Sequence, residues 1–142
     1  MTRKTSRFTG LLVAPVLLGA LTIGGCKKDD EVNATLDMLD ETTEQIVTKV
    51  KSAEDKKAGV ADAQEYLDEH ADELKTKITE LGELRGYQVS DETAEKMASK
   101  LIENIGKVQS LEIELMAQTA TDQELDAKLS KLTDTYTNVV NL

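Results

Sequence analysis

Apolar residues recur along residues 30–140 with the spacing of amphipathic helices. They follow one another in steps of three and four residues in four separate segments. No segment alternates strictly between apolar and polar positions, the pattern of a half-buried strand. The pattern therefore predicts an all-α fold. The predicted core positions are Val32, Leu36, Leu39, Thr43, Ile46, Val50 and Ala53; Val60, Gln64, Leu67, Ala71, Leu74, Ile78 and Leu81; Ala94, Met97, Leu101, Ile105, Val108, Leu111 and Leu115; and Leu125, Leu129, Leu132, Tyr136 and Val139.

Local signals mark the ends of the four segments. Gly59 follows two lysines, which is typical of the C-terminal end of a helix, and Gly86 follows Arg85 in the same way. Ser90 is a predicted N-cap, and Thr121 with Glu124 fits a capping box. The predicted helices are residues 30–57, 60–85, 91–118 and 122–140.

The order of charges supports separate helices joined by short turns. Residues 29–44 hold seven acids and no base, and lysines follow; the other segments are likewise acidic first and more basic later. The helix dipole favours this order, and short connections make successive helices antiparallel. Residues 30–142 are therefore predicted to form one domain, an antiparallel up-down-up-down four-helix bundle.

The first 25 residues differ in composition from the rest of the chain. Arg3, Lys4 and Arg7 precede residues 8–25, which carry no charge. A basic stretch followed by an apolar one is the order of a secretory signal. A membrane span is the alternative, but Pro15 and several glycines make the stretch a poor one. Either interpretation exports the chain that follows.

Ile23, Gly24, Gly25 and Cys26 end this apolar stretch. The tetrapeptide resembles the lipobox of bacterial lipoproteins, and it contains the only cysteine of the chain. The resemblance covers residues 1–26. It implies a signal peptide over residues 1–25, recognition of Ile23, Gly24 and Gly25 by signal peptidase II, and lipid attachment at Cys26. Residues 26–29 are then the lipidated cysteine and a short tether.

A lipid at Cys26 would hold the domain close to a membrane. Two or three acyl chains make a durable anchor, and Lys27, by the sorting preference of enterobacterial lipoproteins, favours the periplasmic face of the outer membrane. A tether of about 10 Å leaves Lys27 and Lys28 near anionic head groups. Tyr87 is a second expected membrane-proximal contact. We also expect the 86–89 turn and the C-terminus at the membrane side.

Composition excludes several classes of function. A net charge of −10 argues against nucleic-acid binding. One histidine and one cysteine cannot form paired His or Cys metal sites, and no nucleophile–base set or phosphate-binding loop is present. We therefore expect no enzymatic activity, no metal and no other cofactor; His70 is expected near a helix boundary or exposed. The sequence ends in Asn141-Leu142, so no covalent peptidoglycan link through a C-terminal lysine is expected.

Two functional hypotheses remain. The first is a non-enzymatic, lipid-anchored periplasmic helical bundle that presents a surface to an envelope protein partner or has a structural role. The alternative is a periplasmic binding or chaperone-like module for cationic or unfolded clients. A sealed core would favour the first hypothesis, and a long exposed apolar groove would favour the second.

Overall fold

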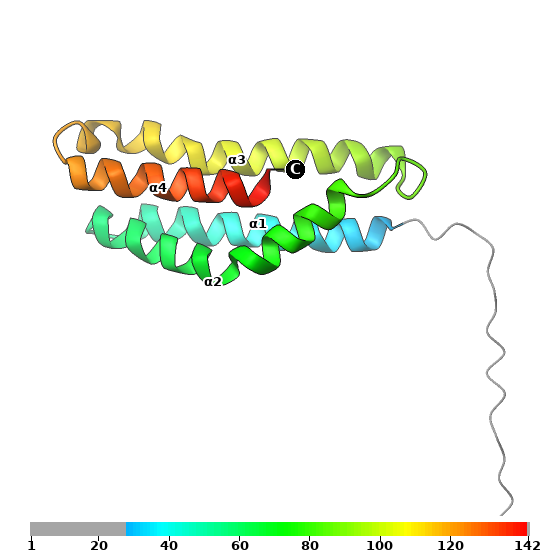
Figure 1. Cartoon of the computed structure of the whole chain (residues 1–142). Coiled ribbons are helices and arrows are strands. Elements are labelled where there is room, and N and C mark those ends of the chain that lie inside the picture. The colour runs from blue at the N-terminus through cyan, green and yellow to red at the C-terminus, as the bar shows by residue number, and fades with distance from the viewer. Residues whose placement is uncertain (1–27, 142) are drawn as a thin grey trace, which may run out of the picture.

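A computed structural model describes residues 28–141, which form four helices joined by short connections (Figure 1). No strand occurs among these described residues. The helices are α1 (Asp29–Ser52), α2 (Lys56–Gly82), α3 (Asp91–Thr119) and α4 (Gln123–Val140). The predicted all-α four-helix bundle is confirmed, and successive helices run in alternating directions (Figure 1).

The boundary between α1 and α2 lies earlier than the sequence signals predict. The carboxylate of Asp55 accepts hydrogen bonds from the N–H groups of Lys57 and Ala58, so α2 begins at Lys56. The Lys56 ammonium donates to the Ala53 carbonyl at 2.8 Å. Lys56 therefore does bond the carbonyl groups at the end of α1, but it does so from the first turn of the next helix. The predicted end of the first helix at residue 57 is therefore wrong.

Gly59 is required by close packing and not by a turn. It lies in the first turns of α2, and a Cβ atom there would be 2.5 Å from Ala53 Cβ and 2.7 Å from the Lys49 carbonyl oxygen. No residue in the part of the chain that the structure describes has a positive φ. The glycine that the sequence suggested as a helix terminator instead lets two helices approach.

Around the bundle the helices follow the order α1, α2, α4, α3. Each of α1 and α4 packs against both α2 and α3, so α2 and α3 are diagonal neighbours. Ser90 N–H donates to Asp29 Oδ1 at 2.8 Å, and Lys51 Nζ lies 2.7 Å from Glu114 Oε1. The first contact joins the starts of α1 and α3, and the second joins their later parts. The side-by-side helices α1 and α3 are therefore parallel.

The lengths of the connections permit this arrangement. The links before α2 and α4 are three residues long and force hairpins, whereas residues 83–90 separate α2 from α3. At about 3.3 Å per residue, eight residues reach roughly 25 Å, enough to cross the end of the bundle. The link is therefore long enough for α2 and α3 to lie diagonally opposite each other in the bundle.

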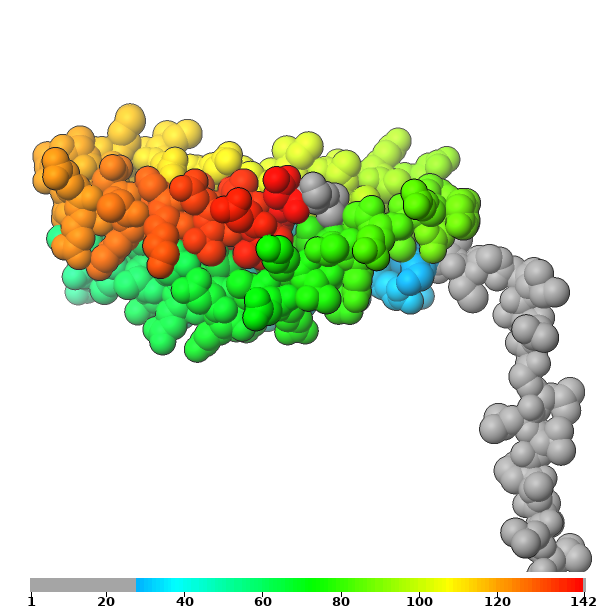
Figure 2. Space-filling view, in the orientation of Figure 1, coloured from blue at the N-terminus to red at the C-terminus, as the bar shows by residue number. Residues whose placement is uncertain are grey.

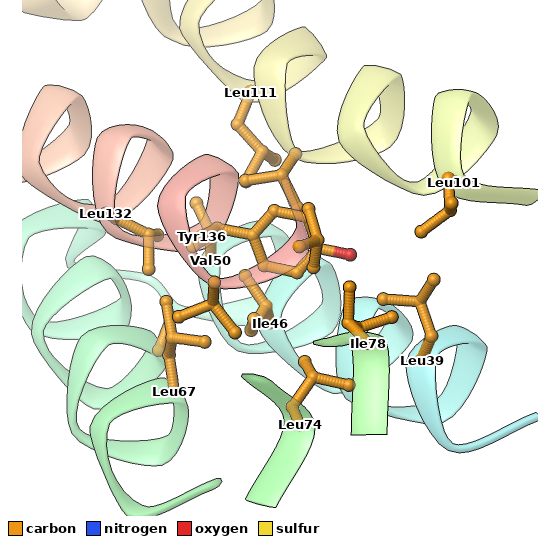
Figure 3. Packing of buried hydrophobic residues seen from close by; sticks show 14 of the residues in the cluster. Leu39, Ile46, Val50, Leu67, Leu74, Ile78, Leu101, Leu111, Leu132 and Tyr136 are labelled. Atoms are coloured by element: carbon orange, nitrogen blue, oxygen red, sulfur yellow. The ribbon is translucent and has the colours of Figure 1, made fainter. Parts of the chain in front are cut away.

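The core is aliphatic around one aromatic ring. Tyr136 of α4 is fully buried and is surrounded by side chains from all four helices, including Ile46, Ile78 and Leu111 (Figure 3). Most predicted core positions are buried, as the heptad pattern requires. Ala94 and Met97 are only partly buried, because α4 is too short to cover them.

α4 stops well before the end of the bundle where α1 begins. It has 18 residues against 29 in α3. Beyond its last turn the surface is formed by α2, which bends past the end of α4, and by residues 83–90 (Figures 1 and 2). α4 therefore runs toward the end that holds the 86–89 turn, as expected, but its last residue lies well short of that end.

Candidate functional site

The sequence-predicted site residues fall into two groups. Ile23, Gly24, Gly25, Cys26 and Lys27 lie outside the described residues. Lys28 and Tyr87 are described, and they lie at the same end of the bundle. This end of the bundle is formed by residue 28, the start of α1 and residues 83–90. We call it the α1-start end.

Hydrogen bonds join Lys28 and Asp29, at the start of α1, to the connection between α2 and α3. Lys28 N–H donates to the Gln88 carbonyl at 2.7 Å. Asp29 Oδ1 accepts from the N–H of Ser90 at 2.8 Å and from its hydroxyl at 3.1 Å. The same Ser90 hydroxyl accepts from Thr93 N–H and caps α3, as the sequence predicts. The starts of α1 and α3 thus share one network of hydrogen bonds.

Tyr87 occupies the tip of the connection between α2 and α3. Gln88 N–H donates to the Arg85 carbonyl at 2.8 Å, and the Gln88 side-chain oxygen accepts from Arg85 N–H at 2.7 Å. This reciprocal pair closes a turn and leaves the Tyr87 side chain 82% exposed. An exposed aromatic ring at the end where the chain enters is a candidate contact surface.

Lys28 is partly neutralised by its own helix. Its ammonium lies 3.0 Å from Glu31 Oε2. On α2, the Lys77 ammonium pairs with Glu80 at 3.0 Å, and this hydrogen bond raises the pKa of Lys77. The end is therefore of mixed charge and is not the basic patch that Lys28 alone suggests.

A groove of about 710 Å³ lies beside this end, between the start of α1 and the end of α2. Val32, Leu81 and Leu84 are among its apolar lining residues, and Glu31, Lys77, Glu80 and Glu83 supply charged ones. Sequence reasoning missed the groove. Two half-buried apolar residues, Met38 and Leu84, lie outside the predicted core positions. They are the only sequence signal that pointed to the groove.

A polar cluster joins α1 and α3 near the middle of the bundle. Asn104 is fully buried and donates to Asp40 Oδ1 at 2.6 Å, and Lys100 lies 2.8 Å from the other Asp40 oxygen. Burial acts to raise the pKa of Asp40, but these two hydrogen bonds outweigh it and hold the pKa below its ordinary value. The cluster holds a charge in place between two helices and contains no nucleophile.

His70 lies within α2 and is half-buried, neither at a helix boundary nor fully exposed. Its Nδ1 lies 2.8 Å from the Tyr66 carbonyl, and its ring packs 4.3 Å from the Tyr66 ring. Within residues 28–141, no three His, Cys, Asp or Glu side chains are grouped so that they could hold a metal ion.

No protein family, no curated protein and no solved structure matches the chain. Within residues 28–141, no helix has the length and apolar character needed to cross a bilayer.

Proposed function

We propose that the chain is a non-enzymatic bacterial lipoprotein, anchored through Cys26 to the periplasmic face of the outer membrane, whose bundle serves an envelope protein partner or has a structural role. The observation that carries the proposal is the sequence Ile23-Gly24-Gly25-Cys26 at the end of a basic and then apolar leader, two residues before the first described residue. Lys27, directly after the cysteine, favours the outer membrane.

The geometry of the α1-start end supports an orientation in which this end faces the membrane. The hydrogen bonds from Lys28 and Asp29 to residues 88 and 90 fix the point where the tether joins the bundle. A tether of about 10 Å then keeps the same end, with the exposed Tyr87, at the head-group layer.

Replacement of Cys26 tests the anchor. Wild-type chain and Cys26→Ala are produced in a Gram-negative host fed an alkyne-tagged fatty acid, and membranes are separated from soluble protein. We expect label and membrane recovery in the wild type, and an unlabelled, uncleaved or mislocalised precursor in Cys26→Ala. Equal fractionation of both chains, with no label in either, would contradict the proposal.

The alternative, a binding module for cationic or unfolded clients, is favoured by the groove beside α1, which Glu31, Glu80 and Glu83 help to line. The sealed core, in which Leu36, Ile46 and Tyr136 are fully buried, favours the first proposal instead. Fluorescence anisotropy with a labelled oligolysine peptide separates the two. Binding that falls at least tenfold in the double variant Glu80→Gln/Glu83→Gln would support the alternative, and no binding would dismiss it.

A further inference from the structure

One polar side chain occupies a core position of α3. Asn104 is fully buried, whereas its neighbour Ile105, which the sequence predicts as the core residue, is only partly buried. From residue 101 on, the buried residues of α3 follow in steps of three and four, and they are Leu101, Asn104, Val108, Leu111 and Leu115. The heptad pattern of α3 therefore contains an amide where an aliphatic side chain is expected.

The Asn104 amide is bonded across the bundle to α1. Its Nδ2 group donates to Asp40 Oδ1 at 2.6 Å and to the Lys100 carbonyl of its own helix at 2.8 Å. Its side-chain oxygen is buried and accepts no hydrogen bond from the residues that the structure describes. Burial of this amide costs free energy, and the bond to Asp40 offsets only part of that cost.

The connections of the chain permit a second lateral order of the same four helices. The eight residues that link α2 to α3 can reach either the neighbouring or the diagonal position. In the order α1, α2, α3, α4, successive helices would still be antiparallel, but α2 would replace α1 as the neighbour of α3. A core built almost entirely of leucine, isoleucine and valine tolerates either order.

The two orders differ in what Asn104 meets. In the observed order it faces α1 and the carboxylate of Asp40. In the other order it would face α2, whose buried residues include no polar side chain. They are Gly59, Val60, Ala63, Leu67, Leu74, Ile78 and Leu81. Asn104 would then lose its partner on another helix and would keep only the bond within α3, so the observed order is favoured.

Two further polar contacts between α1 and α3 lie where water can replace them. Lys51 and Glu114 form an ion pair whose side chains are 47% and 45% exposed, and exposed pairs contribute little to stability. Asp29 and Ser90 are bonded at the end of the bundle, where both residues are partly exposed. The contact of Asn104 is the one made by a fully buried side chain, so it discriminates most strongly between the two orders.

We propose that the Asp40–Asn104 bond selects the lateral order of the bundle, with α1 beside α3. Lys100, 2.8 Å from the second Asp40 oxygen, holds the carboxylate in position. In coiled coils a single buried asparagine fixes the register and the partner of a helix in the same way, at a cost in stability. The selected order places the start of α3 beside the start of α1, and so brings the connection that carries Tyr87 to the point where the chain enters the bundle.

Carbodiimide coupling of neighbouring lysine and carboxylate groups, followed by mass spectrometry of the monomer, measures the order. The wild-type full chain should give the Lys51–Glu114 adduct, because these charged groups lie 2.7 Å apart. In the double variant Asp40→Ala/Asn104→Leu we expect that adduct to fall at least twofold, and adducts between lysines of α2 and acids of α3 to appear. The circular dichroism spectrum and the urea midpoint should not fall, because the variant removes both members of the pair.

Thr133→Val is the matched control. Thr133 is also buried, but its hydroxyl donates to the Leu129 carbonyl of its own helix and so does not distinguish the two orders. The control should give the wild-type adducts. Asn104→Leu alone, which keeps Asp40 beside Lys100, is a second variant for which we expect the same redistribution as in the double variant.

Three results would overturn the proposal. The first is wild-type adducts in the helical double variant, or a weaker Lys51–Glu114 adduct with no coupling between α2 and α3. The second is the same redistribution in Thr133→Val. The third is loss of helix in both Asn104 variants, which would show that the pair stabilises the bundle and does not select its order. Each readout is independent of the proposed lipid anchor.

Discussion

The hydroxyl groups of Tyr136 and Thr43 are hydrogen-bonded to each other inside the core, from α4 to α1. α1 and α4 are diagonal in the bundle, so this bond crosses its centre. The Thr43 hydroxyl also donates to the Leu39 carbonyl at 2.8 Å, which leaves the Tyr136 hydroxyl as the donor between the two side chains. Burial raises the pKa of Tyr136, so it stays protonated and able to donate.

Removing that hydroxyl tests the bond. Tyr136→Phe keeps the ring and deletes the donor, so we expect the free energy of unfolding to fall by about 1 kcal/mol. Tyr136→Ala, which leaves a cavity among leucines and isoleucines, should cost about 3–5 kcal/mol. Urea denaturation followed by circular dichroism measures both. A Phe variant as stable as the wild type would show that the bond contributes nothing.

The two glycines that differ most in their surroundings should respond oppositely to alanine. Gly59→Ala places a methyl group 2.5 Å from Ala53 Cβ and should destabilise the bundle by about 1–3 kcal/mol. Gly106→Ala meets no atom and should stabilise the bundle by about 0.5–1 kcal/mol. Thermal unfolding in dilute protein measures both. The same sign for the two variants would contradict the packing described here.

Stability should fall in acid through Asp40. Its folded-state pKa lies below the unfolded value, so the contribution is complete above about pH 5 and is lost as the pH falls through the folded value. Asp40→Asn should cost about 1 kcal/mol at pH 7 and less at pH 3. The exposed Asp37→Asn is the control. Urea unfolding at the two pH values decides, and an equal cost at both would refute the assignment.

The tie between α1 and α3 should depend on Ser90. Ser90→Ala removes the cap of α3 and the hydroxyl that donates to Asp29, while the Ser90 N–H still donates to Asp29, so we expect a loss of about 1–2 kcal/mol. Amide hydrogen exchange at Val32, whose N–H donates to the Lys28 carbonyl, should also accelerate, because the start of α1 loses one of its hydrogen bonds to the 83–90 connection. Acceleration confined to α3 would mean that the cap acts alone.

Much of the fold is predictable from the sequence because one heptad pattern dominates each helix. Val32, Ile46 and Leu129 are buried where the pattern predicts, and Ser90 caps where its neighbours indicate. The end of α1 is not predictable in this way, because two lysines and Gly59 suit both a helix C-terminus and the start of a packed helix. Only the capping bonds of Asp55 distinguish the two.

The lateral order of the helices and the exposed apolar residues of α3 could not be predicted from the sequence. An eight-residue link accommodates adjacent or diagonal helices, so the parallel pairing of α1 with α3 is not encoded locally. The predicted core positions Leu101 and Leu115 stand one residue away from Ile102 and Met116. Periodicity alone therefore identifies one set of apolar positions on α3. The burial of each side chain is needed to distinguish the buried Leu101 and Leu115 from the exposed Ile102 and Met116.

Lipid attachment at Cys26 is the central claim, and mass spectrometry of the membrane-purified protein tests it most directly. We expect an N-terminal peptide that begins at Cys26, carries the mass of a diacylglyceryl group with or without a further acyl chain, and lacks residues 1–25. A peptide that still contains residues before Cys26, or a Cys26 thiol that reacts with an alkylating reagent, would contradict it.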